Sequence, residues 1–160
     1  MERKILLLGN PELYEVSEPV KPEELSELGP VVADMHDTLM AFRAKYFCGR
    51  AIAAPQIGVK KRMIYMNTGS PTVFINPSLT FPDDEMFEVM DDCMSFPGLL
   101  VRVLRHRRCV IEYTDMRGNP QKMTPAGGLS ELIQHEYDHL DGILAVQRAV
   151  DDKSLFIKEV

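Results

Sequence analysis

The stretch Gln134-His135-Glu136-Tyr137-Asp138-His139 decides the fold, because it places a His-Glu-x-x-His pattern inside a helical sequence. Apolar residues recur around it at the three- and four-residue steps of a helix: Leu129, Leu132, Ile133 and Leu140. Two glycines precede the stretch at 127–128, Ser130 is a candidate N-cap, and Gly142 is a candidate stop. We therefore predict a helix that carries both histidines.

On such a helix, His135 and His139 are four residues apart and share a face. Two imidazoles on one face can hold one metal ion, and Glu136 can then reach a water molecule bound to that ion. The alternative is a polar helix face that carries two histidines by chance. The chain has four histidines, and two of them fall at this spacing around a glutamate, which favours the metal site.

The composition is that of an ordinary globular protein, with 160 residues, 45% hydrophobic and 26% charged. This length predicts one domain, residues 1–160. A net charge of -6 argues against nucleic-acid binding. No apolar run approaches the roughly 20 residues of a membrane span, and the apolar start is too short for a signal peptide. Three cysteines, an odd number, indicate free thiols in a reducing compartment, so we expect a cytoplasmic protein.

The rest of the chain predicts one further long helix and several strands. An apolar stripe from Leu25 to Phe42 predicts a helix whose main part covers 30–46. We expect a short strand or extended entry at 4–8 and a short helix in the tail, 151–160. Alternating or β-rich segments predict strands at 61–66, 72–76, 85–90, 99–104, 107–114 and 120–124.

A catalytic zinc-type site needs a third protein ligand and an open position for water. Downstream of the helix the candidates are weak and include no histidine: Asp141, Asp151, Asp152 and Glu159. Upstream, Cys93 lies in a polar turn, whereas Cys109 lies in a strand-like segment and Cys48 at a helix end. The sequence thus favours Cys93, His135 and His139 around a divalent metal.

These residues suggest a hydrolase. Glu136 would take a proton from the metal-bound water and pass it to a leaving group. The ion and a nearby hydrogen-bond donor would stabilise the oxyanion. Gln56, a neutral polar residue in the otherwise small and apolar run 49–58, is a candidate for that donor.

Three segments in this order resemble the peptide deformylase family, which removes the N-formyl group from new polypeptides. The segments are Gly49-Arg50-Ala51-Ile52-Ala53-Ala54-Pro55-Gln56, Asp91-Asp92-Cys93-Met94-Ser95 and Gln134-His135-Glu136-Tyr137-Asp138-His139. Further likeness lies in Phe74-Ile75-Asn76-Pro77 and in Tyr113-Thr114-Asp115-Met116-Arg117-Gly118, so the resemblance covers nearly the whole chain.

The resemblance implies an α+β fold in which antiparallel sheets surround the helix that carries His135 and His139, with an N-terminal helix beside them. It implies Cys93, His135 and His139 as ligands of one divalent ion, with Fe(II) as the working metal and Zn(II) or Ni(II) able to substitute. Glu136 is then the general acid and base.

For the substrate, the resemblance implies an N-formyl-methionyl peptide, from which formate is released. The Gln56 side chain and the Met94 backbone N–H would hold the formyl oxygen. Gly49, Arg50 and Ala51 would run alongside the peptide, and a nearby apolar pocket would take the methionine side chain. The ribosome is a candidate recruiting partner.

The chain departs from the family pattern at Ala51, where a glycine is usual, and at Asp91-Asp92, where Glu-Gly is usual. These departures leave alternatives open. One is a paralogue that acts on a different N-acyl amide, and another is a metal-stabilised binding protein of the same fold without activity. A zincin-type endoprotease is a third, but it requires a ligand downstream of His139.

Overall fold

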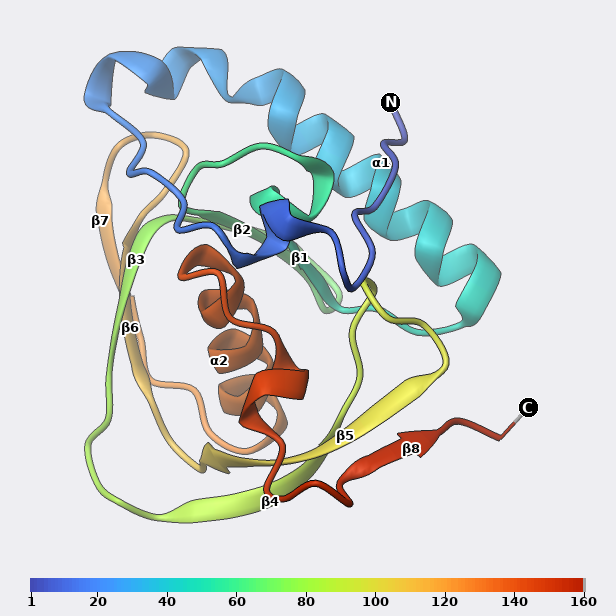
Figure 1. Cartoon of the computed structure of the whole chain (residues 1–160). Helices are drawn as coiled ribbons and strands as arrows, with labels where there is room; N and C mark the ends of the chain where they lie inside the picture. The colour runs from blue at the N-terminus through green and yellow to red at the C-terminus, as the bar shows by residue number, and fades with distance from the viewer. Residues whose placement is uncertain (160) are drawn as a thin grey trace.

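The helix that carries the two histidines, α2 (Gly128–Leu140), lies at the centre of the molecule (Figure 1). The computed structural model describes residues 1–159. Two antiparallel sheets surround α2, and a second helix, α1 (Gly29–Tyr46), lies across the top in the view of Figure 1. The predicted α+β class is therefore confirmed.

The larger sheet has the strand order β1-β2-β3-β6-β7. Its strands are β1 (Ala51–Ala53), β2 (Met63–Asn67), β3 (Pro71–Thr80), β6 (Val110–Thr114) and β7 (Pro120–Met123). The smaller sheet has the order β4-β5-β8, with β4 (Met86–Asp91), β5 (Leu99–His106) and β8 (Leu155–Ile157). Short 3₁₀ helices connect these elements: η1 (Pro11–Tyr14), η2 (Pro22–Glu27), η3 (Ala54–Ile57) and η4 (Ala145–Arg148).

The larger sheet is buried on both faces near β1 and β2, because a helix covers each side. Ile52, Met63 and Tyr65 belong to the core cluster that includes α1. Their neighbours along the strands, Ala53 and Ile64, belong to the cluster that includes α2. Successive side chains of a strand point to opposite faces, so these strands read as continuous apolar runs rather than as an alternation.

Ten of the 13 residues of α2 are buried, including its histidines and Glu136. Buried polar groups are costly unless they find partners, so the polar side of this helix must be matched by polar groups on the sheets. Strands β4 and β5 supply these polar partners, as described below.

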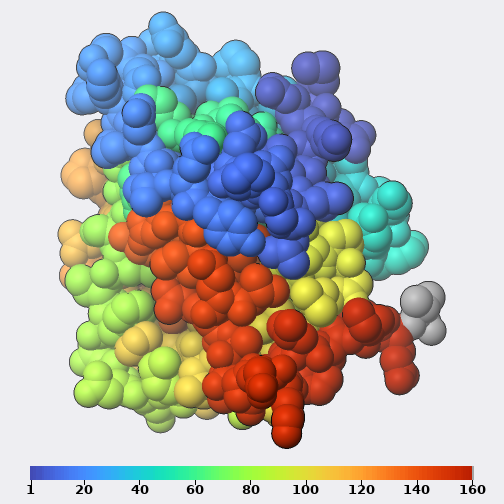
Figure 2. Space-filling view, in the orientation of Figure 1, coloured from blue at the N-terminus to red at the C-terminus, as the bar shows by residue number. Residues whose placement is uncertain are grey.

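The segment before α1 and the segment after α2 lie next to one another on the face shown in Figure 2. The Ser17 backbone N–H donates to the Leu140 carbonyl at 2.9 Å. Gly142 has a φ of +71°, and a Cβ there would lie 2.4 Å from the Tyr14 carbonyl oxygen. Only glycine fits this close approach, which fixes the path of the chain as it leaves α2.

Several local expectations differ from the structure. The tail forms strand β8, which pairs with Leu99–Val101 of β5, instead of a helix. Helix α2 begins at Gly128 with Gly127 as its N-cap, and Ser130 lies inside the helix, where its hydroxyl donates to the His106 carbonyl. No strand forms at residues 4–8: residues 4–7 have no regular secondary structure and Leu8 begins a turn. Among residues 1–159, no helix is long and apolar enough to cross a bilayer.

Candidate metal centre

The three predicted ligands come together although Cys93, in the loop after β4, is far along the chain from the two histidines of α2. The ligand atoms of Cys93, His135 and His139 all lie within 4.8 Å of one another, and all three residues are buried. The Cys93 Sγ is 3.3 Å from the His139 Nε2. Cys93 follows β4, and its neighbour Asp91 ends that strand, so the smaller sheet carries the thiol to the helix.

Asp91 fixes the orientation of the first histidine. Its Oδ2 lies 2.9 Å from the His135 Nδ1, which leaves the Nε2 of that ring for a metal. Burial works against ionisation of Asp91, but His135 and Arg105 beside it hold its pKa at about 2. Asp91 is therefore a carboxylate at neutral pH and favours a cation beside the ring.

The pKa values of the two rings are shifted in opposite directions. Burial opposes a charge on His135, but Asp91 and Cys93 raise its pKa well above the usual value. Burial and the neighbouring His135 lower the pKa of His139 well below the usual value. The Cys93 thiol, the Asp91 carboxylate and the two imidazoles together form a site where a bound cation would be favourable.

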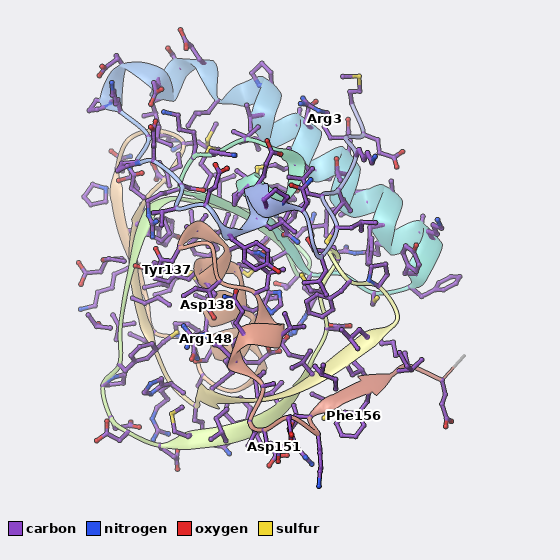
Figure 3. All side chains as sticks on the ribbon, in the orientation of Figure 1. Arg3, Tyr137, Asp138, Arg148, Asp151 and Phe156 are labelled. Atoms are coloured by element: carbon purple, nitrogen blue, oxygen red, sulfur yellow. The ribbon has the colours of Figure 1, made fainter. Side chains whose placement is uncertain are left out.

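A buried network of arginine and aspartate holds Asp91 in place. Arg105 of β5 donates to Asp91 Oδ2 at 3.0 Å and to Asp138 Oδ2 of α2 at 2.7 Å. Arg148 of η4 also binds Asp138, with contacts of 2.5 and 2.9 Å, and Figure 3 shows these two side chains close together. Burial of Arg105 opposes its charge, yet the two aspartates raise its pKa. The network ties β5, η4 and α2 to His135, one of the three candidate ligands.

The amide of Gln56 is oriented toward the thiol. Its Oε1 accepts a hydrogen bond from the Ala53 N–H at 2.9 Å, so its NH₂ group faces the site. The Nε2 donates to Ser95 Oγ at 3.1 Å and lies 3.6 Å from Cys93 Sγ. Gln56 lies in η3 directly after β1, so the turn out of β1 places this donor beside the candidate ligand Cys93.

Glu136 provides a test of whether these residues fit a metal. Its Oε1 is 4.0 Å from the His135 Nε2, and its Oε2 is buried with no hydrogen-bond partner within residues 1–159. Burial raises the pKa of Glu136 to about 7. An orphan carboxylate oxygen beside two imidazoles and a thiol fits a site that holds a divalent ion and its water.

A cavity of about 770 Å³ opens onto this cluster. It is lined by the metal-site residues Cys93, His135 and Glu136 and by the expected substrate-side residues Gly49, Arg50, Ala51 and Met94. Gly49 has a φ of +116°, and a Cβ there would lie 3.3 Å from the Phe42 ring, so glycine is needed at this position.

The wall of this cavity is partly charged. An apolar pocket was expected beside the site, and the lining contains apolar residues together with an ion pair: the Arg50 Nη2 is 2.6 Å from the Glu131 Oε1. Sequence reasoning missed Glu131, which stands four residues before His135 on the same helix face, and that spacing could have revealed it. It also missed the link between Arg105 and Asp91, which needs the pairing of β4 with β5.

The fold and the site define a metal-dependent hydrolase. The sequence model of the polypeptide deformylase family matches residues 2–154. A peptide deformylase of Treponema pallidum is 35% identical over 151 residues, which cover 94% of this chain and 89% of the relative.

Solved structures agree with this match. The crystal structure of the peptide deformylase from Thermotoga maritima aligns with a TM-score of 0.85 at 28% identity, covering 94% of this chain and 99% of that one. A Met-Ala-Ser-bound peptide deformylase from Acinetobacter baumannii aligns with a TM-score of 0.84 at 27% identity, covering 92% and 98%. The chain belongs to the polypeptide deformylase family and is a metal-dependent hydrolase of that family.

Proposed function

We propose that this protein removes the N-formyl group from the N-terminal methionine of newly made polypeptides in the cytoplasm and releases formate. The observation that carries the proposal is the approach of Cys93, His135 and His139 beside a cavity that Cys93, His135 and Glu136 line. The proposed ligands are these three residues, with Fe(II) as the working metal and Zn(II) or Ni(II) as substitutes. When bound, the ion lowers the pKa of a water molecule and polarises the formyl carbonyl group.

Glu136 would move the proton in this reaction. Its pKa of about 7 suits a group that accepts a proton and returns it at neutral pH. The water oxygen bonds to the formyl carbon, the carbon–nitrogen bond breaks, and Glu136 carries the proton of the water to the departing amine nitrogen. The products are formate and a peptide with a free amino group.

Gln56 and Met94 would stabilise the charge that develops on the formyl oxygen. The Gln56 amide group already points toward Cys93, because its oxygen is held by Ala53. A donor that is fixed before the reaction stabilises a developing oxyanion without reorganisation. Met94 lines the cavity, and its backbone N–H is proposed as the second donor.

The peptide would bind along β1. This strand is at the end of the order β1-β2-β3-β6-β7, so its second edge is free within the described sheet. Gly49, Arg50 and Ala51 line the cavity at that edge. An extended peptide can add to such an edge as a further strand and form main-chain hydrogen bonds.

Formate release from formyl-Met-Ala-Ser tests the proposal. Ni(II)-loaded protein should release formate, and Glu136→Gln, which keeps the side-chain volume, should lower kcat by about 10²–10⁴-fold. Metal content of both proteins is measured in parallel, and acetyl-Met-Ala-Ser serves as the competing N-acyl substrate. Release no faster than that of the Glu136→Gln protein, with the metal bound, would refute the proposal. Faster release from the acetyl peptide would favour the paralogue instead.

A further inference from the structure

An ion pair lies in the wall of the reaction cavity, one helical turn from His135. Arg50 Nη2 and Glu131 Oε1 are 2.6 Å apart, and the Glu131 side chain is only 11% exposed, against 49% for Arg50. Both residues line the cavity that contains Cys93 and Glu136. Burial raises the pKa of Glu131, although the hydrogen bond from Arg50 acts to lower it. The carboxylate is therefore only partly hydrated.

The position of the pair relates it to the first residue of a bound peptide. Glu131, His135 and His139 succeed one another at four-residue steps and form one stripe on α2. Four residues of a helix rise about 6 Å, so Glu131 lies about that far along the axis from His135. Arg50 directly precedes β1, the strand proposed to bind the peptide. A peptide with its acyl group at the metal ligands and its main chain on β1 therefore presents its first side chain to Arg50 and Glu131.

We propose that Arg50 and Glu131 determine which first side chain the cavity accepts, and that they favour a neutral side chain whose end both donates and accepts hydrogen bonds over an apolar one. This inference rests on the proposed function for the reaction and the binding mode, because it assumes that an N-acyl peptide binds with its acyl group at Cys93, His135 and His139. It adds that methionine is accepted as the first residue but is not the one that this cavity binds best.

The physical reason is the cost of covering charged groups without replacing their water. An apolar side-chain end against the pair removes water from Arg50 and Glu131 and offers no hydrogen bond in return. A carboxamide can donate to the Glu131 carboxylate and accept from the Arg50 guanidinium. A charged side chain would bind one member of the pair and leave the other without a partner in a partly buried place.

Glutamine and methionine side chains have similar length, so they form a matched pair of probes. We compare kcat/KM for formyl-Gln-Ala-Ser and formyl-Met-Ala-Ser with Ni(II)-loaded wild-type protein and with the double variant Arg50→Leu/Glu131→Leu. Replacing both residues avoids a lone buried charge. The wild-type protein should use the glutamine peptide at least as well as the methionine peptide. The ratio of kcat/KM, glutamine over methionine, should fall by about tenfold or more in the double variant.

A second measurement does not depend on turnover. The product peptides Gln-Ala-Ser and Met-Ala-Ser are titrated into both metal-loaded proteins by calorimetry, and the ratio of the two Kd values should shift in the same direction. Equal ratios in the two proteins would overturn the inference. A shift in the Kd ratio without formate release from either formyl peptide would keep the inference and refute the proposed function.

The wild-type protein alone can decide if the double variant fails to fold, as judged by circular dichroism. In that case the inference requires that the wild-type protein binds Gln-Ala-Ser at least as tightly as Met-Ala-Ser. Tighter binding of Met-Ala-Ser than of Gln-Ala-Ser would overturn it.

Discussion

Asp91 Oδ2 lies 2.9 Å from His135 Nδ1 and 3.0 Å from Arg105 Nη2, so one carboxylate oxygen joins a proposed metal ligand to a buried arginine. Asp91 is the last residue of β4, and His135 lies in α2. Their contact therefore fixes the sheet against the helix at the candidate metal centre. The imidazole can present its Nε2 to an ion only while this contact holds the ring.

Replacing Asp91 by alanine should weaken metal binding by about 10–100-fold, because nothing would then hold the His135 ring. Asp91→Asn is the matched variant, since its Oδ1 can still accept from the ring N–H, and its loss should be smaller. Competition with a chelating dye for Zn(II) measures both affinities. Equal affinity of the wild-type and Asp91→Ala proteins would contradict a positioning role for Asp91.

Gln56 can be tested without disturbing its local structure. Gln56→Glu keeps an oxygen for the Ala53 N–H but removes the NH₂ donor that faces Cys93. We expect kcat for formate release to fall by about 10²–10³-fold, as when one oxyanion donor is lost. Thermal unfolding and metal content serve as controls. If kcat is unchanged while the metal stays bound, Gln56 is not a donor to the reacting oxygen.

Arg105 and Arg148 bind the same carboxylate, Asp138, but differ in burial. The Arg105 side chain is 3% exposed and also binds Asp91, whereas Arg148 is 44% exposed. Arg105→Met should lower the free energy of unfolding by about 3–5 kcal/mol, because it leaves buried carboxylate charge uncompensated. Arg148→Met should cost only about 0–1 kcal/mol. Urea unfolding of the two variants measures the difference, and similar losses would show that burial of the pair does not control its contribution.

Asp115 should make stability depend on pH in a defined direction. Hydrogen bonds from the Asn119 and Arg117 backbones lower its pKa below the usual value of 3.8, although its slight burial opposes this. Since the folded pKa is the lower one, the stabilisation is fully present above about pH 4 and is lost as the pH falls through the folded pKa. The difference in unfolding free energy between wild type and Asp115→Ala should therefore shrink in acid. Urea unfolding at pH 6 and at pH 2.5 tests this, and a constant difference would contradict it.

The sequence was sufficient for those parts of the site that follow from local spacing. The pattern from His135 to His139 specifies a helix face, and the polar turn around Cys93 distinguishes it from Cys109, which is 1% exposed next to β6. The small residues around Gln56 also indicated the segment whose amide lies beside Cys93. These features could be predicted because each depends on a few residues that are neighbours in the sequence.

The remaining features depend on contacts between distant segments. Strand β8 is three residues long with all three exposed, and only its pairing with β5 makes it a strand. Ser130 looked like an N-cap, but its hydroxyl binds the carbonyl of His106, 24 residues away. The Arg50 contact with Glu131 spans 81 residues, so the wall of the cavity could not be read from either segment alone.

The pairing of β8 with β5 also has a practical consequence for anyone who handles this protein. Lys158 and Glu159 line the reaction cavity, and Lys158 Nζ lies 3.0 Å from Asp92 Oδ2. An amine-reactive label on Lys158 would thus lie in the wall of the cavity, break the contact with Asp92 and compete with a peptide for that space.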